Sequence, residues 1–93
     1  MNFGTKLIHA SGDIDPATGS VSTPIYQTST FHQFDIENFG KYDYARSGNP
    51  TRDVVEQLIA ELEGGERGFA FASGMAAICS VLSIFSAGDH IVI

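Results

Sequence analysis

Tyr44 and Arg46 are the side chains in this sequence whose types and spacing are best suited to binding a ligand. In an extended segment, residues two apart point to the same side, so one face would carry a phenolic O–H and a permanently charged guanidinium fork. Both groups donate hydrogen bonds to phosphate oxygens, and the fork can do so with two parallel bonds. The pair therefore predicts an anion site, in which Arg46 supplies charge and Tyr44 fixes orientation. The alternative is a surface arginine paired with Asp43 or Asp53.

A second candidate phosphate site is the small-residue turn Ala72-Ser73-Gly74-Met75. Ser73 is a good helix N-cap, and the N–H groups after it lie at the positive end of the helix dipole. Phosphate binds well at such a helix start, and Gly74 would let the anion approach closely. Ser-Gly is also a common cap that needs no ligand. Taken with Tyr44 and Arg46, the turn predicts a phosphate-bearing cofactor, although the sequence contains neither of the familiar glycine-rich phosphate signatures.

Both candidate sites flank a helix that is predicted to begin at Pro50. Asn49 is a good N-cap, and proline suits the first helical position. Gly64-Gly65 is a stop signal. The apolar residues between them recur at helical spacing, so the charged residues are expected on the solvent side. The apolar stripe comprises Val54, Val55, Leu58, Ile59 and Leu62, and the charged side comprises Arg52, Asp53, Glu56 and Glu61.

The sequence after this helix predicts a strand, a helix and a second strand. Residues 67–72 form a short, nearly uncharged run, typical of a strand buried on both faces. A helix is expected over 74–85 with Cys79 buried on its apolar side, and residues 89–93 are typical of the start of another strand. This alternation with short links predicts an α/β fold with a parallel sheet. Because the sequence stops inside the second strand, we expect a fragment of a larger domain.

Residues 1–50 differ in character from residues 51–93. The first half is rich in Ser, Thr, Gly and Asp and carries a strong turn signal at 15–20. Its segment 21–34 combines aromatic and β-branched residues with threonines and serines, which suits extended structure. Such a segment cannot satisfy its own backbone hydrogen bonds. We therefore expect an N-terminal arm, residues 1–50, that lies on a second subunit.

Composition excludes several other classes of function. Eleven carboxylates against five Lys and Arg residues give a net charge of -6, which argues against nucleic-acid binding. Cys79 is the single cysteine, so no intrachain disulfide can form and a cytoplasmic setting is expected. We expect neither a signal peptide nor a membrane span, which takes about 20 apolar residues. His9, His32 and His90 lack the spacing of metal ligands, so no metal site is predicted.

Six blocks of the sequence, in order, resemble the Cys/Met-metabolism family of pyridoxal-phosphate enzymes. That family includes cystathionine γ-synthase, the cystathionine β- and γ-lyases, methionine γ-lyase and the O-acyl-homoserine sulfhydrylases. The resemblance implies the aspartate-aminotransferase-type fold, fold type I of these enzymes, of which this chain would be the arm and the truncated start of the large domain. It also implies a homotetramer, a dimer of dimers, in which the arm reaches into the neighbouring subunit. The matching blocks are Lys6–Ala10, Thr23–Phe31, Tyr42–Arg52, Leu62–Gly65, Ala72–Ile78 and Ser86–His90.

The resemblance also implies roles for individual residues. Tyr44 and Arg46 would bind the phosphate of pyridoxal 5'-phosphate in the partner's active site, whereas the N–H groups of Gly74 and Met75 would bind it in their own subunit. Tyr44 would assist proton removal near the substrate amine. Asp43 would help to recognise the distal end of cystathionine.

The family's Schiff-base lysine matches no position in this chain. Lys6 and Lys41 are its only lysines, and neither has the apolar surroundings that an amine nucleophile needs. The chain alone is therefore expected to be inactive. The resemblance implies that it is the N-terminal part of a lyase that cleaves cystathionine or related sulfur amino acids by β- or γ-elimination. One alternative is γ-replacement on an O-acylated homoserine. Another is a truncated, non-catalytic phosphate-binding module.

Overall fold

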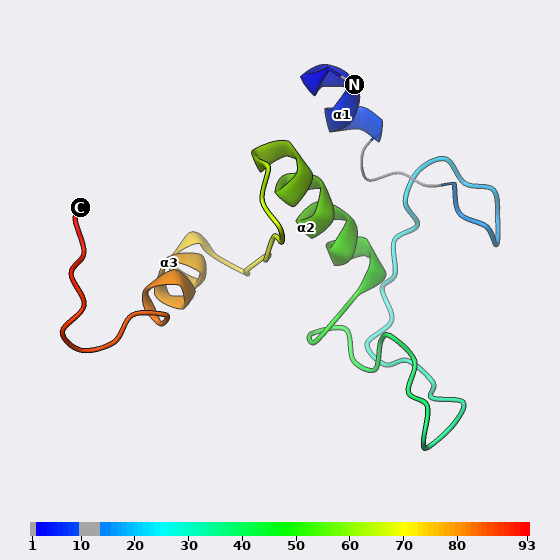
Figure 1. Cartoon of the computed structure of the whole chain (residues 1–93). Helices are drawn as coiled ribbons and strands as arrows, with labels where there is room; N and C mark the ends of the chain where they lie inside the picture. The colour runs from blue at the N-terminus through cyan, green and yellow to red at the C-terminus, as the bar shows by residue number, and fades with distance from the viewer. Residues whose placement is uncertain (1, 10–13) are drawn as a thin grey trace.

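The chain is organised around a 14-residue helix, α2 (Pro50–Glu63), as the computed structural model in Figure 1 shows. The structure describes residues 2–9 and 14–93. Helix α1 (Phe3–His9) contacts α2, and helix α3 (Gly74–Leu82) follows α2 after an irregular segment. Within the expected arm, residues 14–49 are irregular; they loop away from α2 and return to its N-terminus (Figure 1). Helix α1 was not expected from the sequence.

Local signals set both ends of α2, as predicted. The Asn49 side chain accepts the N–H of Thr51 at 2.8 Å, and Pro50 follows the cap at the first helical position. At the other end Gly64 has a left-handed backbone with φ 68°, and its N–H donates to the carbonyls of the last turn. Glycine adopts this conformation without steric strain, so the helix ends there.

The start of α3 is as predicted, but its end is earlier. The Ser73 hydroxyl accepts the N–H of Ala76 at 3.1 Å and caps the helix. Beyond Leu82 the amides of Ile84 and Phe85 bond to carbonyls three residues back instead of four. This tighter turn ends the α-helix before the expected limit at Phe85.

The strands predicted at 67–72 and 89–93 are not formed. Both segments are irregular, and the only bridge of β type in the described residues is an isolated antiparallel one between Thr30 and Tyr44. A strand needs a neighbouring strand to complete its backbone hydrogen bonds, and neither segment has one in the described part of the chain. Phe69 and Phe71 remain 66% and 46% exposed. The prediction of a strand buried on both faces is therefore wrong for this chain.

Little of the apolar surface is buried within the chain. Ala60 is the only residue that counts as buried among those the structure describes. The Cα radius of gyration is 16.9 Å, against about 12 Å for a compact domain of this length. Ile59, Ile78 and Cys79 are exposed, so the prediction of a buried thiol at Cys79 is wrong. Exposed apolar faces of this extent are typical of surfaces that contact other protein surfaces.

Candidate functional site

Tyr44 and Arg46 come together at a tight turn. The sequence predicts an extended segment here instead. The N–H groups of Ser47 and Gly48 both donate to the Tyr44 carbonyl at 3.0 Å, which bends the chain over residues 44–47, called turn 44–47 below. The Nη2 atom of Arg46 then lies 3.3 Å from the Tyr44 hydroxyl oxygen, and its Cζ lies 5.4 Å from the centre of the Tyr44 ring. The phenol and the guanidinium are therefore neighbours, for a different geometric reason than predicted.

The Arg46 guanidinium pairs with no carboxylate among the described residues. Asp43 turns one carboxylate oxygen back to the N–H of Tyr44, at 2.8 Å. Asp53 accepts the hydroxyl of Tyr42 instead, at 2.5 Å. The alternative in which Arg46 pairs with Asp43 or Asp53 is therefore wrong. A guanidinium has five N–H donors, so Arg46 retains several that can bind an external anion.

The arm holds turn 44–47 from one side through backbone hydrogen bonds. The N–H of Phe31 donates to the Asp43 carbonyl at 2.9 Å, and the N–H of Ala45 donates to the Ser29 carbonyl at 2.8 Å. These bonds flank the bridge between Thr30 and Tyr44. The segment expected to be extended thus pairs with the chain that carries the candidate site.

Asn49 and Thr51 have a second role that the sequence did not reveal. The Asn49 amide donates to the Tyr26 carbonyl at 2.9 Å, while its oxygen caps α2. The Thr51 hydroxyl accepts the N–H of Tyr26 and donates to the Pro24 carbonyl, each at 2.9 Å. The start of α2 therefore fastens the arm. No short-range sequence pattern could show this, because the partners are more than 20 residues apart.

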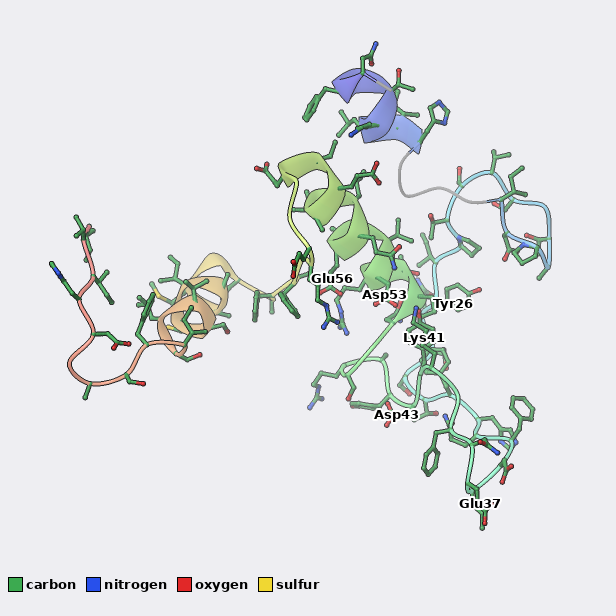
Figure 2. The ribbon with its side chains drawn as sticks, in the orientation of Figure 1. Tyr26, Glu37, Lys41, Asp43, Asp53 and Glu56 are labelled. Atoms are coloured by element: carbon green, nitrogen blue, oxygen red, sulfur yellow. The ribbon has the colours of Figure 1, made fainter. Side chains whose placement is uncertain are left out.

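Asp53, in the first turn of α2, contacts both Lys41 and Tyr42. Figure 2 shows Lys41 next to Asp53. The ammonium of Lys41 lies 3.5 Å from the carboxylate of Asp53. A hydrogen bond with Tyr42, together with the charges of Tyr42 and Asp53, raises the pKa of Lys41. Partial burial and the hydrogen bond to Asp53 raise the pKa of Tyr42. Both shifts favour the forms present at neutral pH, an ammonium and a neutral phenol.

These shifts predict a loss of stability at alkaline pH. Because the pKa of Tyr42 is raised on folding, the folded state binds more protons than the unfolded state above the usual tyrosine pKa of about 10. The contribution of this contact to stability is complete below that pH and disappears as the pH rises through the folded-state pKa. We expect Tyr42→Phe to flatten this alkaline decline in denaturant unfolding of the complete protein above about pH 10. An unchanged decline would contradict the assignment to Tyr42.

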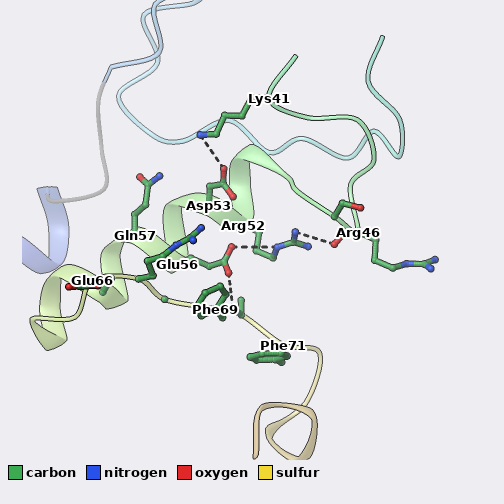
Figure 3. Close-up of a pocket in the computed structure, with 14 residues that line it drawn as sticks. Lys41, Arg46, Arg52, Asp53, Glu56, Gln57, Glu66, Phe69 and Phe71 are labelled. Atoms are coloured by element: carbon green, nitrogen blue, oxygen red, sulfur yellow. Dashed lines mark hydrogen bonds and ion pairs between the residues drawn. The ribbon is translucent and has the colours of Figure 1, made fainter. Parts of the chain in front are cut away.

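An open hollow of about 620 Å³ lies beside α2, between turn 44–47 and the segment that leads to α3 (Figure 3). Arg52 and Glu56 line it, with side chains that are 32% and 19% exposed. The sequence placed both on the solvent side of the helix, which is wrong because this side packs against the turn and against residues 68–70. Their spacing of four residues was the available signal, since it favours an ion pair on a helix.

The second predicted phosphate site lies at the start of α3. Gly74 and Met75 are the first residues of the helix, so their N–H groups have no acceptor within it. A Cβ built on Gly74 would meet no atom within 4 Å, so the space beside its Cα atom is open. Figure 1 shows α3 well apart from the turn that precedes α2. The two candidate phosphate sites therefore do not converge within one chain.

Two further features of the described residues bear on the kind of site. No three His, Cys, Asp or Glu side chains among residues 2–9 and 14–93 come close enough together to hold a metal ion. Within the same residues, each helix is too short or too polar to cross a membrane.

Comparison with known proteins assigns the chain to a protein family. Residues 4–93 match the family of Cys/Met metabolism PLP-dependent enzymes. The chain belongs to this family, whose cofactor is pyridoxal phosphate. This confirms the family resemblance of the sequence.

Individual relatives are similar over nearly the whole chain. A cystathionine beta-lyase of Lactococcus lactis subsp. cremoris is 58% identical over 89 residues, which are 96% of this chain and 23% of that protein. The crystal structure of cystathionine gamma-lyase from Lactobacillus plantarum complexed with L-serine superposes with a TM-score of 0.86 at 58% identity, covering 97% of this chain and 23% of that one. A structure of cystathionine gamma synthase from Xanthomonas oryzae pv. oryzae gives a TM-score of 0.82 at 43% identity, with coverage of 89% and 21%. The chain thus spans less than a quarter of these relatives.

Proposed function

We propose that this chain provides phosphate-binding groups to a PLP-dependent lyase that cleaves carbon–sulfur bonds in cystathionine or related amino acids by β- or γ-elimination. The observation that carries the proposal is the Arg46 guanidinium, which stands beside the Tyr44 hydroxyl and pairs with no carboxylate among the described residues. In a chain of net charge -6 from this family, an anion is the expected partner of such a group.

The residues fit the phosphate of pyridoxal 5'-phosphate at both candidate sites. Arg46 would neutralise its charge, and the Tyr44 hydroxyl would donate one further hydrogen bond. The N–H groups of Gly74 and Met75 would add the positive end of the α3 dipole. When bound, the cofactor supplies the electron sink for carbanion chemistry, and the protein supplies binding and orientation.

The separation of the two sites supports a shared active site between subunits. In our proposal the arm of one protomer brings Tyr44 and Arg46 to the cofactor of its partner, while α3 binds the cofactor of its own subunit. A homotetramer built as a dimer of dimers would satisfy this arrangement. It would also cover the apolar faces that the chain leaves exposed. Residues 1–50 would then act as the intersubunit arm and residues 51–93 as the beginning of the cofactor-binding domain.

Tyr44 and Asp43 would act on the substrate. Tyr44 is 39% exposed, so its phenolic oxygen is accessible, and in the phenolate form it would accept a proton near the substrate amine. Asp43 is exposed, and one of its carboxylate oxygens accepts the N–H of Tyr44, which holds the side chain beside the turn. In that position it would recognise the ammonium at the distal end of cystathionine. The cytoplasmic location expected from the single cysteine is part of the same proposal.

The products formed from cystathionine test the proposed reaction in the complete protein. With one water consumed, β-elimination yields homocysteine, pyruvate and ammonia, whereas γ-elimination yields cysteine, 2-oxobutyrate and ammonia. We expect one of these product sets, identified by the keto acid. The 93-residue chain alone is expected to form neither, and elimination by the isolated chain would contradict the predicted need for a lysine outside it.

γ-Replacement is the alternative, supported by the similarity to a cystathionine gamma synthase. A complete protein that converts O-acylated homoserine and cysteine into cystathionine and a carboxylic acid, with no keto acid from cystathionine, would favour it. A non-catalytic phosphate-binding module is the remaining candidate. It would bind pyridoxal 5'-phosphate or inorganic phosphate without either reaction.

A further inference from the structure

One side chain of α2 holds the backbone of turn 44–47. The Nη1 atom of Arg52 donates to the Ala45 carbonyl, and its Nη2 atom donates to the Arg46 carbonyl, each at 3.2 Å. Figure 3 shows the Arg46 side chain extending away from Arg52. Arg52 therefore fixes the backbone of the turn and leaves the Arg46 guanidinium free to bind elsewhere.

Glu56 orients Arg52 from the next turn of the helix. Its Oε1 atom lies 3.6 Å from the Nε atom of Arg52, and its Oε2 atom accepts the N–H of Ala70 at 2.9 Å. The backbone at Gly68 packs against the same part of α2, where an added Cβ would lie 2.4 Å from the Glu56 carbonyl oxygen. The pair thus joins turn 44–47 to the segment that leads to the cap of α3.

We propose that Arg52 is a positioning residue for phosphate binding, that it acts through Arg46, and that Glu56 orients it. The proposal rests on the function proposed above, because it presumes that Arg46 binds phosphate. The planar fork of Arg52 spans two neighbouring carbonyls at once, and a lysine ammonium cannot reproduce that geometry. Because both bonds end on backbone atoms of the turn, losing them would release Arg46 without removing any group that touches the phosphate.

The test measures the dissociation constant of pyridoxal 5'-phosphate for variants of the complete protein, by equilibrium dialysis. Arg52→Met and Arg52→Lys are each expected to weaken binding about tenfold, since both remove the two-pronged hydrogen-bonding group that spans the two carbonyls, although lysine keeps the charge. Arg67→Met is the matched control. It removes the same charge from the lining of the same hollow, but Arg67 lies over the Phe69 ring, 5.4 Å from its centre, rather than on the turn. It is expected to change binding less than about twofold, as is usual for such a surface position.

A double-mutant cycle separates positioning from a general structural role. If Arg52 acts through Arg46, then Arg52→Met should have less than about a twofold further effect once Arg46→Ala is present. A full tenfold effect in that background would overturn the proposal. So would recovery of normal binding in Arg52→Lys, because it would show that charge alone suffices.

Two outcomes distinguish this inference from the proposed function. Unchanged binding in Arg46→Ala would contradict the phosphate site itself. Weakened binding in Arg46→Ala with normal binding in both Arg52 variants would overturn the positioning role alone.

If Arg52→Met lowers the unfolding temperature of the apoprotein, Glu56→Gln replaces it in the cycle. Its amide oxygen can still accept the N–H of Ala70, and loss of the negative charge beside Arg52 is expected to weaken binding about threefold; unchanged binding would overturn the role of Glu56.

Discussion

Arg46→Ala is expected to weaken the binding of pyridoxal 5'-phosphate by the complete protein roughly 10- to 100-fold. A hydrogen bond to a charged group contributes about 1.5–3 kcal/mol, and about 1.4 kcal/mol corresponds to a factor of ten in affinity. The Tyr44 hydroxyl, 3.3 Å from the guanidinium, would remain and preserve part of the affinity. Tyr44→Phe is expected to have a smaller effect, about fivefold, because it removes one neutral donor. The measurement is the dissociation constant of the cofactor.

Pyridoxal without its phosphate provides the sharpest control for Arg46. If Arg46 binds the phosphate, Arg46→Ala should leave the affinity for pyridoxal unchanged while it lowers the affinity for the phosphorylated form. Arg67→Ala removes an equal charge and should change neither. Equal losses for both ligands would mean that Arg46 supports the fold of the site and does not contact phosphate.

The parts of the fold that were predictable from sequence are those set by neighbouring residues. Asn49 and Gly64 fix the ends of α2 through hydrogen bonds within one turn of the helix, and Ser73 does the same at the start of α3. The strand at 67–72 depends instead on a neighbouring strand, and none is found among the described residues, in a chain that spans 23% of a relative's length. The hydrophobic pattern of that segment predicts burial, which this chain alone cannot provide.

The candidate site was predicted in part. The residue types at Tyr44 and Arg46 indicated an anion site, and the structure brings the two side chains together, but through turn 44–47. The supporting contacts of Arg52 escaped prediction because they end on backbone carbonyls, which carry no sequence signature. A charged residue on a helix is ordinarily assigned to solvent, and the pairing partner six or seven residues away is visible only in three dimensions.

Two glycines near the second candidate site should respond in opposite ways to replacement by alanine. A Cβ at Gly68 would lie 2.4 Å from the Glu56 carbonyl oxygen, so the backbone must move away from α2. We expect Gly68→Ala to destabilise the complete apoprotein by about 1–3 kcal/mol, the usual result of overpacking. The loss should appear as a lower midpoint in denaturant unfolding.

Gly74→Ala should spare stability and affect the cofactor. A Cβ there would meet nothing within 4 Å in this chain, and replacing glycine where alanine fits stabilises a protein by about 0.4–1 kcal/mol. A phosphate bound to the N–H groups of Gly74 and Met75 would meet the new methyl group, so cofactor affinity is expected to fall about tenfold. Normal affinity in Gly74→Ala would show that the phosphate does not lie against the Cα atom of Gly74. A loss of affinity without a loss of stability would identify the start of α3 as a phosphate-binding element. Alanine at position 74 would not disturb a helix start that binds no ligand.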